Sequence, residues 1–328
     1  MLKKYFNMLA ILMAMVLVVS CSDDDNGNEP SKSENQMLID YIESTTDYIN
    51  TNAPAIKSAE AVYQAMTADK VHIVDIRAKE DYDKGHIEDA VHVPLSDLLT
   101  HVEGLDLAND VFIAIVCYSG QSAAYGTGLL RLMGHDNVYS MKFGMSSWSE
   151  ETIGPWQGNV GNTYASQFVT EETEKPEKSA LPNISTGEST GAEILRARVE
   201  QAFAEGFGPA KVSNSEVFGD LDGYQIVNYW PENLYLDPGH IPGAMQYTPK
   251  EDLAFDTDLL TLSNDKPIAV YCFTGQTSAN VTAFLRVLGY DAKSLLFGTN
   301  GMIYGIASSR DDLHAWSDAA NMGYDIVK

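Results

Sequence analysis

The stretch VFIAIVCYSGQSAAYGTGLLRLMG, from Val111 to Gly134, combines an apolar run, a cysteine, a glycine and a segment with helical spacing. The β-favouring residues before Cys117 predict a buried strand, and the leucines near the end recur on one side of a helix. The same arrangement returns in KPIAVYCFTGQTSANVTAFLRVLG, from Lys266 to Gly289, where Cys272 takes the place of Cys117. The chain is therefore a tandem repeat, and each copy carries one thiol between a strand end and a helix start.

The position of each thiol favours its ionised form. The first turn of a helix leaves backbone N–H groups without partners, and these groups stabilise an anion such as a thiolate. The helix dipole contributes at most about 2 kcal/mol, so the remainder must come from direct N–H hydrogen bonds inside a tight loop. Gly120 and Gly275 can adopt the backbone angles that such a loop requires. Cys117 and Cys272 are therefore the candidate nucleophiles.

The loops CYSGQS, from Cys117 to Ser122, and CFTGQT, from Cys272 to Thr277, resemble the six-residue active-site loop of rhodanese-type sulfurtransferases. IVDIRAKEDYDKGHIEDAVHVP, from Ile73 to Pro94, is similar to the family's Asp-x-Arg strand and its Gly-His-Ile turn. PGHIPGAMQYTP, from Pro238 to Pro249, resembles the same turn. The resemblance covers most of both repeats. It implies an α/β fold with two rhodanese-like domains, each a small parallel sheet flanked by helices, which agrees with the alternation of strands and helices.

The resemblance also implies sulfur transfer. Cys117 or Cys272 would take a sulfur atom from a small donor such as thiosulfate or a mercapto acid, and would pass it from a persulfide to cyanide or a thiol. The residues expected to line the substrate-binding loops are Tyr118, Ser119, Gly120, Gln121 and Ser122 in the first repeat, and Phe273, Thr274, Gly275, Gln276 and Thr277 in the second. Two alternatives stay open: a non-catalytic rhodanese-fold binding or sulfur-carrier module, and a redox sensor whose thiol forms sulfenic acid.

The residues of the two loops disfavour one class of reaction but do not identify the sulfur donor. Phosphatases that share this fold use a longer loop ending in Arg, and neither loop here contains Arg or Lys. The neutral loops also differ from the basic loop of thiosulfate-specific relatives. Tyr118 and Phe273 replace the glycine that follows the cysteine in typical mercaptopyruvate enzymes. Phosphoryl chemistry is disfavoured, and the identity of the sulfur donor stays open.

Several residues around the loops are expected to have supporting roles. Asp75 and Arg77 lie at a strand end, where family members use them to brace the loop, whereas the second repeat has Asn228 and Trp230 at the aligned positions. The histidines of the two Gly-His-Ile turns are expected to be hydrogen-bonded structural residues. No cluster has metal-ligand spacing, and the GTG at Gly126 to Gly128 lies inside a helix, so neither a metal nor a nucleotide cofactor is expected.

The N-terminus predicts export and a lipid anchor. Two lysines precede an apolar run of about twelve residues, which is shorter than the roughly 20 that a membrane span needs. VVSC, from Val18 to Cys21, resembles a bacterial lipobox, in which the cysteine is lipidated. The predicted location is therefore the bacterial cell envelope, with the protein anchored to the outer membrane through Cys21 on its periplasmic or outer face.

Composition and spacing complete the predicted organisation. The net charge of −25 argues against nucleic acid and anionic membrane surfaces as partners. Cys117 and Cys272 occupy equivalent positions in separate repeats, so no disulfide between them is expected. The tail after Tyr304 has no clear counterpart in the first repeat. The expected boundaries are a signal peptide at 1–20, a flexible tether at 21–35, a first rhodanese-like domain at 36–150, a linker at 151–190 and a second rhodanese-like domain at 191–328.

Overall fold

The computed structural model of the protein describes residues 32–328. The predicted signal peptide, the lipidation site Cys21 and most of the predicted tether lie outside the described residues. Residues 33–328 form one compact unit that contains both repeats. Within the described part of the chain, every helix is too short or too polar to cross a bilayer.

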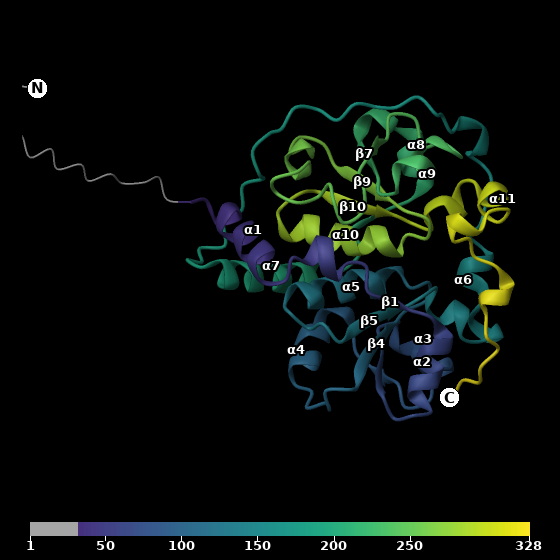
Figure 1. Ribbon diagram of the computed structural model, residues 1–328. Coiled ribbons are helices and arrows are strands. Elements are labelled where there is room, and N and C mark those ends of the chain that lie inside the picture. The colour runs from purple at the N-terminus through teal and green to yellow at the C-terminus, as the bar shows by residue number, and fades with distance from the viewer. Residues whose placement is uncertain (1–31) are drawn as a thin grey trace, which may run out of the picture. The chain divides into compact units, whose positions relative to one another are not determined.

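Two parallel five-stranded sheets, one in each repeat, carry the fold (Figure 1). Their strand orders are β1-β5-β4-β2-β3 and β6-β10-β9-β7-β8, so the second sheet repeats the first. The predicted α/β class with two small parallel sheets is confirmed. The strands of the first sheet are β1 (Ile56–Lys57), β2 (Val71–Asp75), β3 (Val91–His92), β4 (Phe112–Val116) and β5 (Val138–Met141). Those of the second are β6 (Lys211–Val212), β7 (Gln225–Asn228), β8 (Met245–Gln246), β9 (Ile268–Tyr271) and β10 (Ala292–Leu295).

Helices flank both sheets. The α-helices of the first repeat and the segment after it are α1 (Glu34–Thr45), α2 (Ala59–Met66), α3 (Lys79–Lys84), α4 (Leu98–Glu103), α5 (Gln121–Leu132) and α6 (Gly154–Gln157). Those of the second repeat are α7 (Gly191–Glu205), α8 (Asn214–Gly219), α9 (Glu232–Leu236), α10 (Gln276–Val287) and α11 (Tyr304–Ala307). The helix α2 is capped by the Ser58 side chain, which accepts the backbone N–H of Ala61.

The helices that follow the two cysteines, α5 and α10, pack directly against each other between the two sheets (Figure 1). Gly128 of α5 permits this close approach. A β-carbon at this position would lie 2.9 Å from the β-carbon of Ala283 on α10 and 2.6 Å from the Tyr48 hydroxyl. That hydroxyl is already held by the Asn280 carbonyl oxygen at 3.1 Å. The GTG sequence is therefore a packing feature of the contact between the repeats.

Alanine in place of Gly128 is expected to lower the free energy of unfolding by about 1–3 kcal/mol, because the added methyl group overpacks the contact between α5 and α10. Denaturant unfolding of the purified protein measures this change. The matched control is Gly219→Ala, since Gly219 also lies in a helix but has open space at its β-carbon. Equal stability of the two variants would contradict the proposed role of Gly128.

The leading helix of each repeat contacts the opposite repeat. Helices α1 and α7 lie side by side (Figure 1). The Asn35 side chain at the start of α1 donates a hydrogen bond of 2.6 Å to the Leu288 carbonyl oxygen in the second repeat. Arg196 of α7 forms an ion pair of 2.7 Å with Glu103 of α4 in the first repeat. These contacts hold the two repeats in one unit.

The segment that follows each repeat forms a β-bridge with the other repeat. Val169, within the predicted linker, forms an antiparallel bridge with His240 of the second repeat. Val327, near the C-terminus, forms the same bridge with His86 of the first repeat. Each histidine ring also bonds a backbone carbonyl oxygen, which agrees with the structural role predicted for both. The C-terminal tail therefore has a counterpart in the linker. The linker pairs with the second repeat, and the tail pairs with the first repeat in the same way.

Candidate active site

In the first repeat, the sulfur of Cys117 caps the helix that follows it. Strand β4 ends at Val116, and Gly120 adopts a left-handed conformation, with φ of 85°, to begin α5. The helix α5 has no side-chain oxygen as its N-cap. The Cys117 Sγ instead accepts the backbone N–H groups of Gly120 at 3.1 Å and Ala123 at 3.4 Å. The sulfur therefore occupies the place of a capping oxygen, where a negative charge is stabilised.

The second repeat builds the same cap with one additional polar group. The Cys272 Sγ accepts the backbone N–H groups of Gly275 at 3.2 Å and Ser278 at 3.3 Å, and Gly275 has φ of 81°. The Ser278 hydroxyl lies 3.5 Å from the same sulfur and 2.8 Å from the Ser294 hydroxyl. The first repeat has Ala123 where the second has Ser278. The Cys272 sulfur thus has a hydroxyl oxygen beside it, to which its thiol donates, in addition to the two backbone N–H groups.

Both candidate nucleophiles are almost fully covered. Cys117 and Cys272 are each 2% exposed, and neither forms a disulfide with another residue in the part of the chain that the structure describes. A reactant must therefore enter the mouth of the loop to reach the sulfur. Among residues 32–328, no group of three or more histidine, cysteine or acidic side chains could hold a metal ion.

Asp75 and Arg77 brace the first loop through a buried ion pair. Asp75 ends β2 and lies opposite Val116, the residue before Cys117. The Arg77 guanidinium donates to the Asp75 carboxylate at 2.6 and 2.9 Å and to the Gly85 carbonyl oxygen at 2.7 Å. The ring of Tyr118 lies over this guanidinium, with 5.9 Å between the ring centre and the guanidinium carbon. The pair therefore supports the first residue of the loop after the cysteine.

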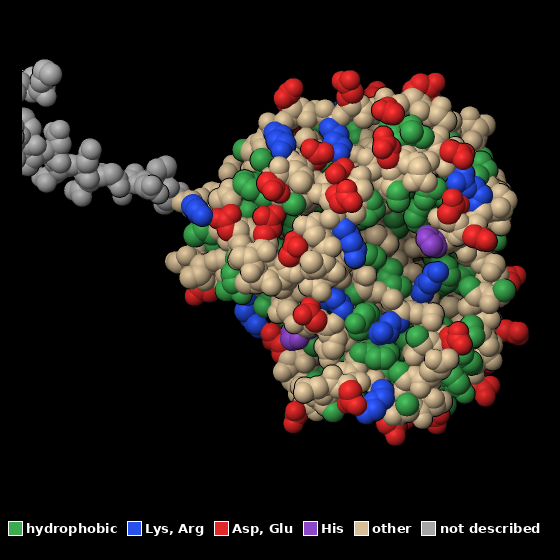
Figure 2. Space-filling view, viewed as in Figure 1, with side chains coloured by type: hydrophobic (Ala, Val, Ile, Leu, Met, Phe, Trp, Pro, Cys, Tyr) green, Lys and Arg blue, Asp and Glu red, His purple; other side chains and the backbone are tan. Residues whose placement is uncertain are grey.

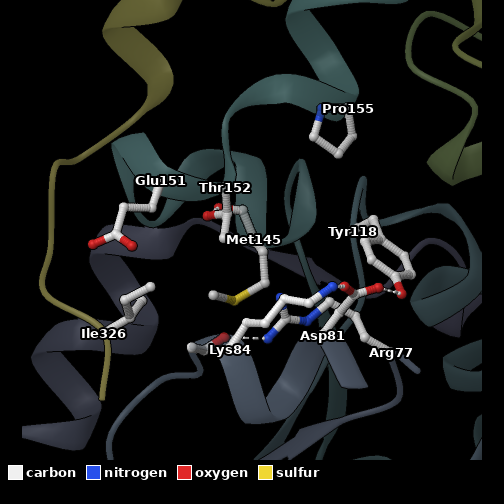
Figure 3. Close-up of a pocket in the computed structure, with 10 residues that line it drawn as sticks. Arg77, Asp81, Lys84, Tyr118, Met145, Glu151, Thr152, Pro155 and Ile326 are labelled. Atoms are coloured by element: carbon white, nitrogen blue, oxygen red, sulfur yellow. Dashed lines mark hydrogen bonds and ion pairs between the residues drawn. The ribbon is translucent and has the colours of Figure 1, made fainter. Parts of the chain in front are cut away.

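Tyr118 connects the loop to the rim of a cavity of about 230 Å³ (Figure 3). Its hydroxyl donates a hydrogen bond of 2.6 Å to the Asp81 carboxylate and accepts the Ala78 N–H at 3.2 Å. Burial and the Asp81 carboxylate raise the pKa of Tyr118, so its hydroxyl is protonated near neutral pH. The cavity is lined by both cationic and anionic side chains, including Lys84 and Glu151. The cysteine itself does not line this cavity.

The second repeat replaces the ion pair with aromatic contacts. The Asn228 side chain donates a hydrogen bond of 2.8 Å to the Tyr271 hydroxyl. The Trp230 ring stacks on Phe273, with ring centres 4.9 Å apart and planes 8° apart. Phe273 is the residue after Cys272, so Trp230 supports it as Arg77 supports Tyr118. The residues at the aligned positions differ between the repeats, but in both repeats they contact the residue that follows the cysteine.

Two of the predicted loop residues point across to the other repeat. The Gln121 Oε1 accepts the Phe297 N–H at 2.8 Å, and the Gln276 Oε1 accepts the Phe143 N–H at 2.8 Å. The Gln276 amide also donates to the Gly120 carbonyl oxygen at 3.3 Å. Both glutamine side chains are buried. The two cysteine loops are therefore joined by hydrogen bonds through the contact between the repeats.

Three residues from outside the second loop lie beside it, and the sequence analysis predicted none of them. A cavity of about 260 Å³ is lined by Phe273, Thr274, Gln276 and Thr277 of the loop, together with Ile56, Lys142 and His314. Lys142 comes directly after β5 of the first repeat, and His314 lies in the C-terminal segment. Neither residue belongs to a motif, so only the contact between the repeats reveals them.

The comparisons with known proteins identify the family. The model of the Rhodanese-like domain matches residues 58–151 and 219–302, which together are more than half of the chain. The chain therefore belongs to the family of proteins with rhodanese-like domains, and it carries two of them. This membership supports a sulfurtransferase or sulfur-carrier role.

The relatives found by these comparisons are distant. The protein "Putative sulfur carrier protein YrkF" of Bacillus subtilis is 26% identical over 125 residues, which are 37% of this chain and 66% of that protein. "Adenylyltransferase and sulfurtransferase uba4" of Ogataea parapolymorpha is 29% identical over 80 residues, which are 24% of this chain and 20% of that protein. The chain thus spans less than two thirds of either relative. The crystal structure of a thiosulfate sulfurtransferase from Pseudomonas aeruginosa is 17% identical, with 87% of this chain and 48% of that chain covered at a TM-score of 0.30.

Proposed function

We propose that this protein is a sulfurtransferase in which Cys272 and Cys117 carry the transferred sulfur as a persulfide. The observation that supports this most directly is the environment of the two sulfurs. Each Sγ accepts two backbone N–H groups at the start of a helix, and no other side chain caps that helix. This arrangement stabilises a thiolate, which is the nucleophilic form of cysteine.

The proposed reaction has two displacement steps. The thiolate attacks the outer sulfur of thiosulfate, a sulfur–sulfur bond forms to the cysteine, and the bond inside thiosulfate breaks with its electron pair leaving on sulfite. Cyanide or an acceptor thiolate then attacks the outer sulfur of the persulfide. The product is thiocyanate or a new persulfide, and the cysteine thiolate is restored. The loop N–H groups remain in place to stabilise the anionic sulfur in both steps.

A sulfur-carrier role is the second candidate. The burial of both sulfurs, each 2% exposed, would protect a stored persulfide from solvent. The Bacillus subtilis relative is also named for sulfur carriage. A carrier would form the persulfide but would release it only to a specific protein partner. The lipid anchor at Cys21, and the cell-envelope location that it implies, stay predictions from the sequence.

The double variant with Cys117→Ser and Cys272→Ser tests the proposal. The parent protein, treated with thiosulfate or mercaptopyruvate, is expected to gain the mass of one sulfur atom on a cysteine and to produce thiocyanate from cyanide. The double variant is expected to do neither, because a serine hydroxyl is not ionised at neutral pH. Turnover at the parent rate in the double variant would exclude both thiols as carriers. A persulfide without turnover would favour the carrier role, and an oxygen adduct after peroxide alone would favour a redox sensor.

A further inference from the structure

The cavity against the Cys272 loop is built from three separate parts of the chain. Four loop residues form one side of it, and Ile56 and Lys142 of the first repeat form another. His314 closes it from the C-terminal segment, where its ring lies edge-on to Phe273 with ring centres 5.2 Å apart. Figure 2 shows a hollowed region on one face of the molecule with a histidine and basic side chains around it. The cavity therefore exists only when the repeats are in contact.

Lys142 is a cation without an acidic partner. It forms no ion pair with any residue from 32 to 328, although acidic residues outnumber basic ones by 46 to 21 in the whole sequence. Its ammonium group lies 5.0 Å from the centre of the Phe143 ring. Burial lowers the pKa of Lys142, since its charge is partly removed from water. A bound anion would offset this unfavourable burial.

His314 adds a neutral hydrogen-bonding group beside the cation. Burial, and then the charge of Lys142, lower the pKa of His314, while the Asp312 carboxylate opposes them. Asp312 is itself held by Arg310 at 2.8 and 3.0 Å. The imidazole is therefore neutral near pH 7 and offers one N–H donor. No hydrogen bond from this ring to another described residue competes for it.

We propose that this cavity binds the anionic end of the sulfur donor, the sulfonate of thiosulfate or the carboxylate of a mercapto acid, with Lys142 as its principal cation. This inference rests on the proposed sulfurtransferase function. Leu296 follows β10 where Lys142 follows β5, so the second repeat offers no matching cation to the Cys117 loop at this position. The acidic surface does not prevent binding, since charges farther than about 8 Å are largely screened at physiological salt. Anionic donors therefore load Cys272 and not Cys117.

The test measures binding without turnover. The parent for this test is the double variant with Cys117→Ser and Cys272→Ser. Calorimetry measures thiosulfate binding to this parent and to two triple variants, which carry Lys142→Gln or Lys142→Arg in addition. Lys142→Gln is expected to weaken binding by about tenfold or more, because a charge-assisted contact is lost. Lys142→Arg should retain most of the affinity, since it keeps the positive charge. The control is Lys178→Gln, which makes the same change of net charge at an exposed lysine whose ammonium group donates a hydrogen bond to the Asp256 carbonyl oxygen.

The outcomes separate this inference from the proposed function. Circular dichroism first confirms that each variant is folded. Equal thiosulfate affinity in Lys142→Gln and its parent, or no thiosulfate binding at millimolar concentration, overturns the anion site. Binding that depends on Lys142, in a protein whose intact cysteines form no persulfide, upholds the anion site and refutes the sulfurtransferase.

Discussion

Serine in place of Cys272 is expected to reduce kcat/KM with thiosulfate by at least about 100-fold, because removal of a nucleophile leaves only binding and electrostatic effects. Serine in place of Cys117 should leave most of this activity. The difference follows from the surroundings of the two sulfurs. Lys142 lines the cavity beside the Cys272 loop, and the Ser278 hydroxyl lies 3.5 Å from the Cys272 sulfur, whereas Leu296 and Ala123 take the related positions in the sequence.

The comparison of the two single variants should be made with a second, uncharged donor such as an organic trisulfide. Without a negative charge the donor gains nothing from Lys142, so the gap between Cys272→Ser and Cys117→Ser should narrow. A greater loss of thiosulfate turnover in Cys117→Ser than in Cys272→Ser would show that the first repeat is the working site. The Asp-x-Arg motif, which only the first repeat has, would then be the better guide to activity than the cavity.

The parts of the site that the sequence predicts are those that local chemistry determines. A run of buried β-favouring residues, a cysteine and a glycine that takes positive φ specify the strand, the loop and the helix start without reference to the rest of the chain. The structure has Cys117 and Cys272 at these positions, with the sulfurs on the helix N–H groups. The two-sheet architecture follows for the same reason, since each repeat supplies its own alternation of strands and helices.

The parts that sequence reasoning missed are set by the contact between the repeats. Apolar periodicity shows that α5 and α10 have buried faces, but it does not show that the faces meet each other. Lys142 and His314 become part of one cavity only through that contact. The Asp-x-Arg motif likewise predicts supporting residues only for the first repeat. Trp230 stacks on Phe273 in the second repeat, so a brace of different chemistry occupies the same place.

Methionine in place of Arg77 is expected to lower the free energy of unfolding by about 3–5 kcal/mol, because it leaves a buried carboxylate without its partner. Asp75 is 1% exposed and Arg77 is 4% exposed, and the guanidinium satisfies both the Asp75 carboxylate and the Gly85 carbonyl oxygen. Denaturant unfolding measures the loss. The control is Arg310→Met, whose carboxylate partners Asp237 and Asp312 are well exposed, so a much smaller effect is expected.

The double variant with Asp75→Asn and Arg77→Met separates two contributions to the loss of stability, the unpaired buried charge and the lost packing of the Arg77 side chain. Removal of both charges should recover part of the stability lost in Arg77→Met, because no ionised group then remains unpaired in the interior. The Tyr118 ring would still lose the guanidinium beneath it. Sulfur transfer through Cys117 should therefore remain impaired even where stability is recovered, while transfer through Cys272 should be unchanged, since Trp230 and not an ion pair supports Phe273. Additive losses of stability in the double variant would show that the buried charge does not govern the effect.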